Sequence, residues 1–267
     1  MNKILVIALN TFREARRDRI MYILIFFALL MISSSLVFST ISADQGNKIV
    51  KDFGLTSISV FGVMISIFLG TGLVYKEIEK NTVYNIFSKP VERYQFILGK
   101  YLGLAITVLV ITFCMALILF IVVLYVELPN SDFIIYYYKG HYFKEFFLAI
   151  YFEYLEFLII IGIAMVFSSF TTPVLSIILT TLAFFMGRFS ADIRLFAEEV
   201  RNPIVNYLSE VLYRVIPNLE KLNFRSEAVY GGEVSLALIL NTTFYATIYS
   251  SVLILLTIVV FQRKEFK

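Results

Sequence analysis

Two glutamates, Glu153 and Glu156, are the side chains of this sequence with the clearest capacity for chemistry, because they interrupt a long apolar run. They are three residues apart, so a helix places both carboxylates on one face. Acids in such a setting are costly, and they bind a substrate or ion, relay protons, or pair with basic side chains. Two interpretations stay open: a substrate or ion site, and structural pairing or placement near lipid headgroups. We favour the second.

The sequence contains few other groups for catalysis or metal binding. His141 is its one histidine and Cys114 its one cysteine, so neither a histidine cluster nor an intrachain disulfide can form. No GxxxxGK[ST] phosphate loop, GxGxxG turn, nucleophile elbow or paired-histidine motif occurs in it. We therefore predict a chain with no catalytic residues, no metal site and no ATP hydrolysis of its own.

The composition places these acids in a membrane protein. The chain is 59% hydrophobic and 16% charged, with a mean hydropathy of +0.83, outside the balance of soluble domains. The net charge of +3 is spread among loops and gives little support to nucleic-acid binding. A bilayer crossing needs about 20 apolar helical residues, and six runs qualify, of which the fifth is the shortest: residues 20–41, 55–75, 101–126, 146–167, 174–187 and 235–261. Since lipid leaves backbone groups unsatisfied, we predict an all-α polytopic membrane protein with six transmembrane helices.

The basic residues predict the orientation. Thirteen Lys and Arg lie in residues 1–19, 75–100 and the C-terminal tail, against ten in the longer intervening loops. By the positive-inside rule, both termini are expected in the cytoplasm. Residues 1–19 are either an amphipathic interfacial helix or a positive flank that orients the first span.

The outer segment 188–234 is predicted to contain two amphipathic helices, one capped by Ser190 and one between Pro203 and Pro217. We expect their apolar faces to pack toward the membrane domain. They could form a structural lid, which we favour, or an exit gate.

Between the second and third runs lies a charged segment, residues 75–100. Apolar residues at helical spacing within it, among them Ile78 and Ile86, predict a short helix that Pro90 ends. Pro90 also suits the start of the next helix, with Glu92 in its first turn. Such a helix–corner–helix element could transmit a push to the third span. The alternative is an ordinary charged loop.

The segment YKEIEKNTVYNIFSKPVERYQFILGK resembles the cytoplasmic loop of ABC-2-type ABC transporter permeases. That family has acidic residues, a Gly-Thr pair, a small-Lys/Arg-Pro-Val corner, an Arg and a Gly-Lys in this order; here Asn81 replaces the usual glycine. Residues 10–22 resemble the family's amphipathic elbow helix. Among subgroups, the Ser-Lys-Pro-Val corner looks most like permeases associated with nitrous-oxide reductase maturation.

The resemblance implies a single permease domain over residues 1–267 that acts in export, in a bacterial or archaeal cytoplasmic (inner) membrane. It implies a second permease copy and a separate ATPase subunit that binds ATP and Mg²⁺, with no cofactor on this chain. A coupling helix within residues 76–100 would dock on the ATPase. The residues expected to couple to it are Glu77, Glu79, Asn81, Thr82, Tyr84, Ser88, Lys89, Pro90 and Arg93.

Two other classes of function stay open. A membrane-embedded lipid-modifying enzyme would need acids, His or Cys clustered at one depth. A non-transporting scaffold or assembly factor is compatible with the coupling segment. A neighbouring reading frame that encodes an ATPase would favour the permease, and lipid-modifying activity of the chain alone would favour the enzyme.

Overall fold

The computed structural model describes residues 3–41, 46–79, 92–127, 141–200, 203–230 and 234–263, which contain helices and no strand. In chain order these helices are α1 (Lys3–Ala15), α2 (Arg19–Ile41), α3 (Gly46–Glu79), α5 (Arg93–Glu127), α7 (His141–Ser168), α8 (Pro173–Arg188), α9 (Ser190–Val200), α10 (Pro203–Val215), the 3-10 helix η1 (Glu220–Leu222), α11 (Arg225–Tyr230) and α12 (Leu236–Arg263). The all-α prediction is confirmed for these residues.

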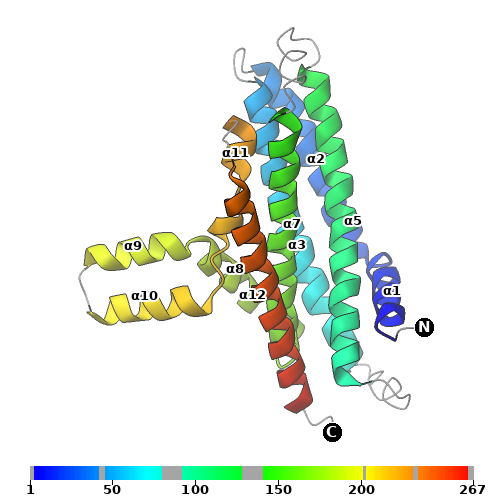
Figure 1. Ribbon diagram of the computed structural model, residues 1–267. Helices are drawn as coiled ribbons and strands as arrows, with labels where there is room; N and C mark the ends of the chain where they lie inside the picture. The colour runs from blue at the N-terminus through cyan, green and yellow to red at the C-terminus, as the bar shows by residue number, and fades with distance from the viewer. Residues whose placement is uncertain are drawn as a thin grey trace.

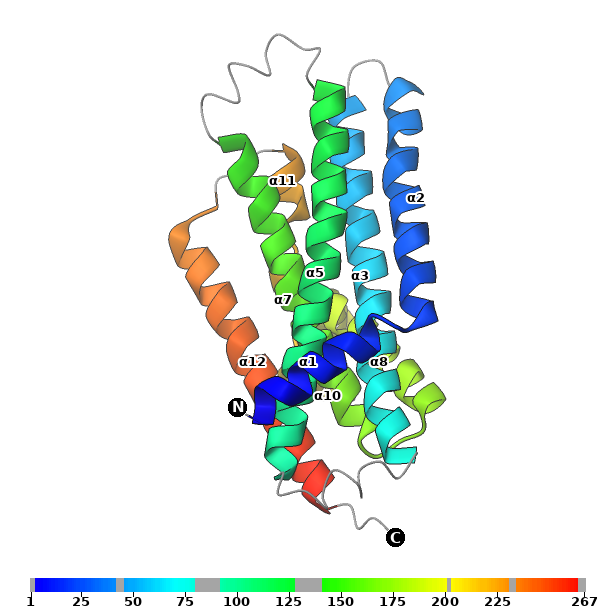
Figure 2. The same cartoon turned by 90° about the vertical axis from the view of Figure 1, so that its right-hand side faces the viewer.

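Five helices, α2, α3, α5, α7 and α12, are long and apolar enough to cross a membrane. They run side by side as a bundle (Figures 1 and 2). We call the end where α5 begins and α12 ends the terminal end, and the opposite one the far end. In the most apolar stretches of α3 and α7, 67% of the residues are buried inside the protein, against 22% in those of α2 and α12. The centre of the bundle is therefore the α3–α7 pair.

Glycines on α3 allow α7 to approach closely. A Cβ on Gly62 would lie 2.1 Å from the ring of Phe157, and one on Gly70 would lie 2.7 Å from the Cβ of Ala164. Small residues at helix contacts bring backbones together in membrane proteins, where dispersion contacts replace the hydrophobic effect. The contact between α3 and α7 thus depends on the absence of side chains at these two positions.

The fifth predicted span forms a helix but does not cross the bundle. Helix α8 has 16 residues, beginning with Pro173 at its first turn and ending at Arg188. The chain then bends by 62° into α9. At 1.5 Å per residue, α8 is about 24 Å long, short of the roughly 30 Å hydrocarbon core. The described residues therefore contain five helices that could each cross a membrane, and α8 with the start of α9 forms a bent pair, either a broken span or a re-entrant segment.

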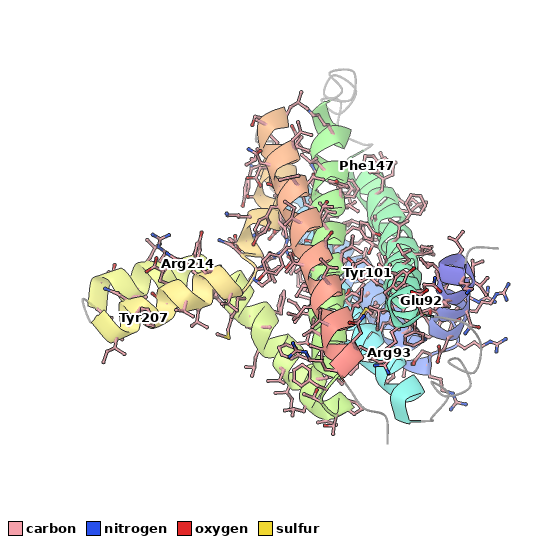
Figure 3. All side chains as sticks on the ribbon, turned by 60° about the horizontal axis from the view of Figure 1, so that its bottom comes forward. Glu92, Arg93, Tyr101, Phe147, Tyr207 and Arg214 are labelled. Atoms are coloured by element: carbon pink, nitrogen blue, oxygen red, sulfur yellow. The ribbon has the colours of Figure 1, made fainter. Side chains whose placement is uncertain are left out.

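Helices α9 and α10 form an antiparallel hairpin, which we call the arm (residues 190–215). Both predicted amphipathic helices are confirmed as helices, but the expected packing is not seen. The arm projects away from the bundle (Figures 1 and 3), and the side chain of Phe196 is 64% exposed. Ala197 and Ser209 are buried, and the Arg194 guanidinium lies 5.3 Å from the centre of the Tyr213 ring across the hairpin.

Helix α1 lies across α5 near the terminal end (Figure 2). A Cβ on Gly99 of α5 would lie 2.6 Å from Ile7, and one on Gly103 would lie 2.5 Å from the carbonyl oxygen of Ala8. The opposite side of α1 leaves apolar side chains exposed, including Leu5 and Leu9. This arrangement suits a helix in the membrane interface, packed on α5 by one side.

Candidate functional site

The predicted coupling segment is described only at its edges. Glu77 and Glu79 lie in the last turn of α3, which continues without a break from Gly46. They therefore extend the second span rather than a separate coupling helix. Six of the predicted coupling residues, Asn81, Thr82, Tyr84, Ser88, Lys89 and Pro90, lie outside the described residues.

Arg93, the first residue of α5, joins this segment to the C-terminus of α12. Its Nη1 donates to the carbonyl oxygens of Phe261 at 3.3 Å and Gln262 at 2.7 Å. The last carbonyls of a helix lack intrahelical partners, and a cation there is favourable to the helix dipole. The Phe96 and Phe261 rings also stack, with centroids 5.8 Å apart. Arg93 thus fastens α12 to the start of α5 (Figure 3).

The helix start differs slightly from the prediction. Glu92 precedes α5 instead of lying in its first turn, and its backbone N–H donates to the Gln95 side-chain oxygen at 3.4 Å. The carbonyl of Glu92 accepts the N–H of Phe96 at 3.2 Å. A Gln three residues after the cap that reaches back to the cap N–H is one half of a capping box. Local capping by Glu92 and Gln95 therefore sets the start of α5.

Lys100 holds α5 against α1, a role that the sequence did not predict. The sequence analysis placed Lys100 only in the Gly-Lys pair that ends the coupling segment. Its side chain is 1% exposed, and its Nζ lies 3.2 Å from Glu14 Oε2 of α1. Gly99 and Gly103, where α1 crosses, form a GxxxG pattern around Lys100, which could have indicated a close helix contact. The segment 80–91 therefore leads into a helix that is fastened to both α1 and α12.

The two intramembrane glutamates are buried, and each pairs with an arginine. Glu153 Oε1 lies 3.4 Å from Arg225 Nη2 of α11, and Glu156 Oε2 lies 3.3 Å from Arg188 Nη1 of α8. The Glu153 and Glu156 side chains are 6% and 1% exposed. The second interpretation offered above, structural pairing, describes this geometry.

Further contacts extend the two pairs into a network. Arg225 Nη1 donates to the Thr56 hydroxyl of α3 at 3.0 Å. Arg188 Nη1 also reaches the carbonyl of Leu219 at 3.5 Å, and its Nε lies 3.8 Å from Glu220. Among the described residues, Glu153 Oε2 and Glu156 Oε1 are buried with no hydrogen-bond partner. The network joins α3, α7 and α8 to the segment that follows the arm.

Sequence reasoning did not identify Arg188 and Arg225 as these partners. The cost of a buried acid signals that a basic partner is needed, but the partners are 32 and 72 residues away in the chain. Both belong to a segment with several other basic residues, so the sequence offers no way to choose among them.

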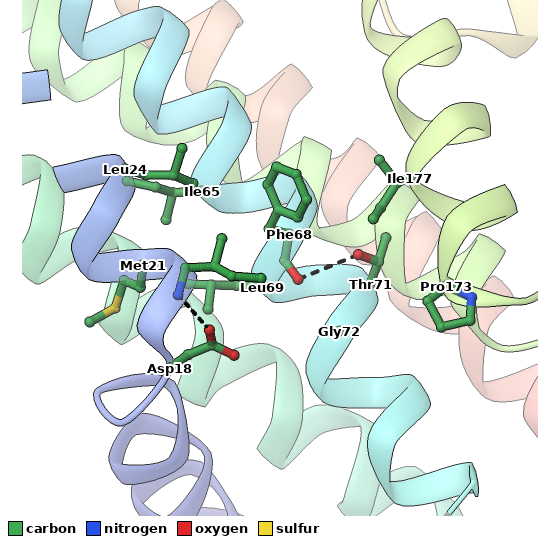
Figure 4. A pocket seen from close by; sticks show the side chains of 11 residues that line it. Asp18, Met21, Leu24, Ile65, Phe68, Leu69, Thr71, Gly72, Pro173 and Ile177 are labelled. Atoms are coloured by element: carbon green, nitrogen blue, oxygen red, sulfur yellow. Dashed lines mark hydrogen bonds between the residues drawn. The ribbon is translucent and has the colours of Figure 1, made fainter. Parts of the chain in front are cut away.

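A cavity of about 190 Å³ lies between the terminal halves of α2, α3 and α8, with a mostly apolar lining (Figure 4). Asp18 at its edge accepts the N–H of Ile20 at 3.0 Å and so caps α2. Thr71 donates to the carbonyl of Ile67 within its own helix. Both polar groups are thus engaged in the structure of their helices, and the cavity offers space but no reactive group.

A sequence model of the family described as ABC-2 family transporter protein matches residues 12–187. The match begins in α1 and ends at the last turn of α8, so it covers the first four spans and stops before the arm. It is to the family as a whole, and the resemblance of residues 88–91 to one subgroup stays a prediction. No curated protein matches the chain.

Proposed function

The chain belongs to the ABC-2 transporter family, and on this premise we propose that it is the non-catalytic permease subunit of an ATP-driven exporter. A second copy completes the pathway, and a separate ATPase subunit binds ATP and Mg²⁺. We place the complex in a bacterial or archaeal cytoplasmic membrane with both termini in the cytoplasm, following the distribution of Lys and Arg.

The observation that carries this proposal is the connection of the coupling segment to the bundle. Residues 80–91 are joined on one side to α3 and on the other to α5, which Arg93 fastens to α12 and Lys100 fastens to α1. A docked ATPase that displaces this segment would therefore act on four helices together. Transport driven by a partner needs such a connection, because a loosely attached loop would absorb the displacement.

Displacement of α3 passes to α7 through their close contact. With the Phe157 ring against Gly62, neither helix can move toward the other, since packed interiors transmit strain. Helix α7 in turn binds α8 and α11 through Glu156–Arg188 and Glu153–Arg225. We assign these pairs the role of keeping α7 attached to the segment around the arm.

The experiment is co-purification with an ATPase encoded in a neighbouring reading frame. Tagged wild-type chain is expected to retrieve the ATPase from membranes, with ATP hydrolysis in the complex. Reversing the charges with Glu77→Lys and Glu79→Lys is expected to lower the retrieved ATPase about tenfold or more, as like charges meet at the contact. Asp52→Lys is the control, because this exposed acid lies on the same helix near the far end.

The two possible failures are distinct. If the wild-type chain retrieves no ATPase, the proposed function is wrong. If it does and the reversed chain retrieves as much, the function stands and the assignment of Glu77 and Glu79 to the contact is wrong.

A further inference from the structure

The cavity between α2, α3 and α8 lies where three apolar stretches reach their terminal ends. The stretch of α2 that could cross a membrane begins at Arg19, that of α3 ends at Gly72, and that of the bent pair α8–α9 begins at Pro173. Gly72 and Pro173 line the cavity, together with Ile20, the residue after Arg19. The cavity is therefore at the depth where lipid headgroups meet acyl chains.

The cavity lies beside side chains that face the surrounding lipid. Helices α2 and α8 both pack on α3, and Figure 4 shows them on opposite sides of the cavity, with Phe68 and Leu69 of α3 between them. At its edges, Ile20 of α2 is 47% exposed and Val174 of α8 is 69% exposed. An acyl chain that lies along α2 or α8 thus has an apolar space next to it.

The chain turns from α1 into α2 through residues 16–19, which we call the corner. Its first three N–H groups donate to carbonyls of α1 at 3.0 Å each, and the Tyr22 hydroxyl donates to the carbonyl of Arg16 at 2.6 Å. Arg17 and Arg19 are the chain neighbours of Asp18, which lines the cavity. The corner therefore has a defined backbone and carries basic side chains beside the cavity.

The corner has an excess of positive charge. The side chains of Arg16, Arg17 and Arg19 are exposed, and the ion pairs of the described residues do not include them. Asp18 contributes one negative charge against these three positive ones, and its carboxylate already accepts the N–H of Ile20. Arginines at a membrane surface attract anionic lipid headgroups.

We propose that an anionic phospholipid of the bilayer binds here, with one acyl chain in the cavity and its phosphate at the arginines of the corner. The apolar space alone would accept any lipid tail, and the exposed arginines alone would attract any anion. An anionic phospholipid carries both groups in one molecule, and basic pockets between transmembrane helices bind such headgroups. The inference concerns the bilayer and not the ATPase, so it does not rest on the proposed function.

The test is fluorescence quenching in bilayers by phospholipids with brominated acyl chains, since bromine quenches a tryptophan that it contacts. The sequence contains no tryptophan, so one introduced residue is the only reporter. Ile20→Trp places it at the edge of the cavity. The matched control is Phe113→Trp on α5, where the native side chain is 63% exposed. Brominated phosphatidylglycerol, which is anionic, is compared with brominated phosphatidylcholine, which is zwitterionic.

With the Ile20→Trp reporter we expect phosphatidylglycerol to bind about tenfold more strongly than phosphatidylcholine, because several basic side chains act on one headgroup. With the Phe113→Trp reporter the two lipids should quench equally.

Replacement of the basic side chains tests the role of the corner. The triple variant Arg16→Gln, Arg17→Gln, Arg19→Gln should lose the preference for phosphatidylglycerol. Its matched control removes the same number of positive charges at the C-terminus, by Arg263→Gln, Lys264→Gln and Lys267→Gln, and should keep the preference.

A further variant tests whether the acyl chain enters the cavity. A Cβ on Gly72 meets nothing within 4 Å, so Gly72→Phe places a ring in open space and should remove most of the preference measured with Ile20→Trp. Gly72→Ala, which adds one methyl group at the same position, is the control and should keep it. Each variant is first shown to be monodisperse in detergent, so that a misfolded chain is not counted.

Four results would overturn the proposal. Equal quenching by the two lipids with Ile20→Trp would mean that no selective site exists, and a preference that persists in the triple arginine variant would mean that the corner does not hold the headgroup. A preference that persists in Gly72→Phe would place the acyl chain outside the cavity. An equal loss in the C-terminal control would mean that the overall surface charge, and not the corner, selects the lipid.

Discussion

Removing Arg188 should destabilise the protein more than removing its partner Glu156. The Glu156 side chain is 1% exposed, and its one hydrogen bond among the described residues comes from Arg188. Arg188 is 16% exposed and retains Glu220 and the Leu219 carbonyl if Glu156 is lost. The two single variants therefore leave very different groups unsatisfied, although they break the same pair.

The magnitudes follow from this asymmetry. Arg188→Met leaves a buried carboxylate alone and should cost about 3–5 kcal/mol. Glu156→Gln leaves an arginine with two other partners and should cost about 1–3 kcal/mol. The double variant Glu156→Leu with Arg188→Met removes both charges and should lie within about 1 kcal/mol of the wild type, as replaced buried ion pairs often do.

The assay is equilibrium unfolding in mixed detergent micelles, followed by far-UV circular dichroism, with transport measured in vesicles alongside. The reasoning is refuted if Arg188→Met is no less stable than Glu156→Gln, or if the double variant is less stable than Arg188→Met. Transport separates the two interpretations of Glu156. A stable double variant that still transports supports structural pairing, and a stable one that does not supports a substrate or ion site.

Three further predictions concern the contacts between helices. Gly62→Leu should cost about 1–3 kcal/mol of stability through overpacking against Phe157. The control Gly72→Ala, where a Cβ meets nothing within 4 Å, should be neutral or stabilising by up to about 1 kcal/mol. Thermal unfolding measures both, and equal losses of stability would count against the tight α3–α7 contact. Arg93→Met should cost only about 1 kcal/mol of stability, since its hydrogen bonds to the end of α12 lie near the surface. It should nevertheless lower ATP-driven transport severalfold while ATPase co-purification is unchanged. Unchanged transport would mean that the link between α5 and α12 does not transmit the motion. Tyr249→Phe should cost about 1 kcal/mol, because it removes the hydrogen bond to the Val215 carbonyl, and it should speed amide hydrogen exchange in residues 215–219. Unchanged exchange there would show that this bond does not hold the end of the arm.

The transmembrane helices were predictable because hydrocarbon permits few alternatives. Residues 101–126 and 146–167 are apolar runs. In hydrocarbon, a helix is the structure in which a single segment satisfies all of its own backbone hydrogen bonds. The ends were less predictable, since they depend on caps. Helix α5 begins at Arg93, two turns before the apolar run, because Glu92 and Gln95 cap it.

The candidate site was predictable only in part. Spacing correctly put Glu153 and Glu156 on one face, since both are buried within the bundle. Their partners come from distant segments, and spacing carries no information about such contacts. The arm shows the same limit: periodicity predicted two amphipathic helices, but it identifies a face without saying what covers it. The expectation that this face packs on the chain's own bundle was wrong for that reason.

Helix α3 is held against α7 at two points. Its 34 residues, Gly46–Glu79, extend about 51 Å at 1.5 Å per residue. The contacts of Gly62 with Phe157 and of Gly70 with Ala164 are separated by about 12 Å along the helix. A tilt of α3 against α7 would open one of these contacts or force the other to overlap. The two helices are therefore expected to move as one unit, so a displacement of α3 at the terminal end reaches the far end through both helices together.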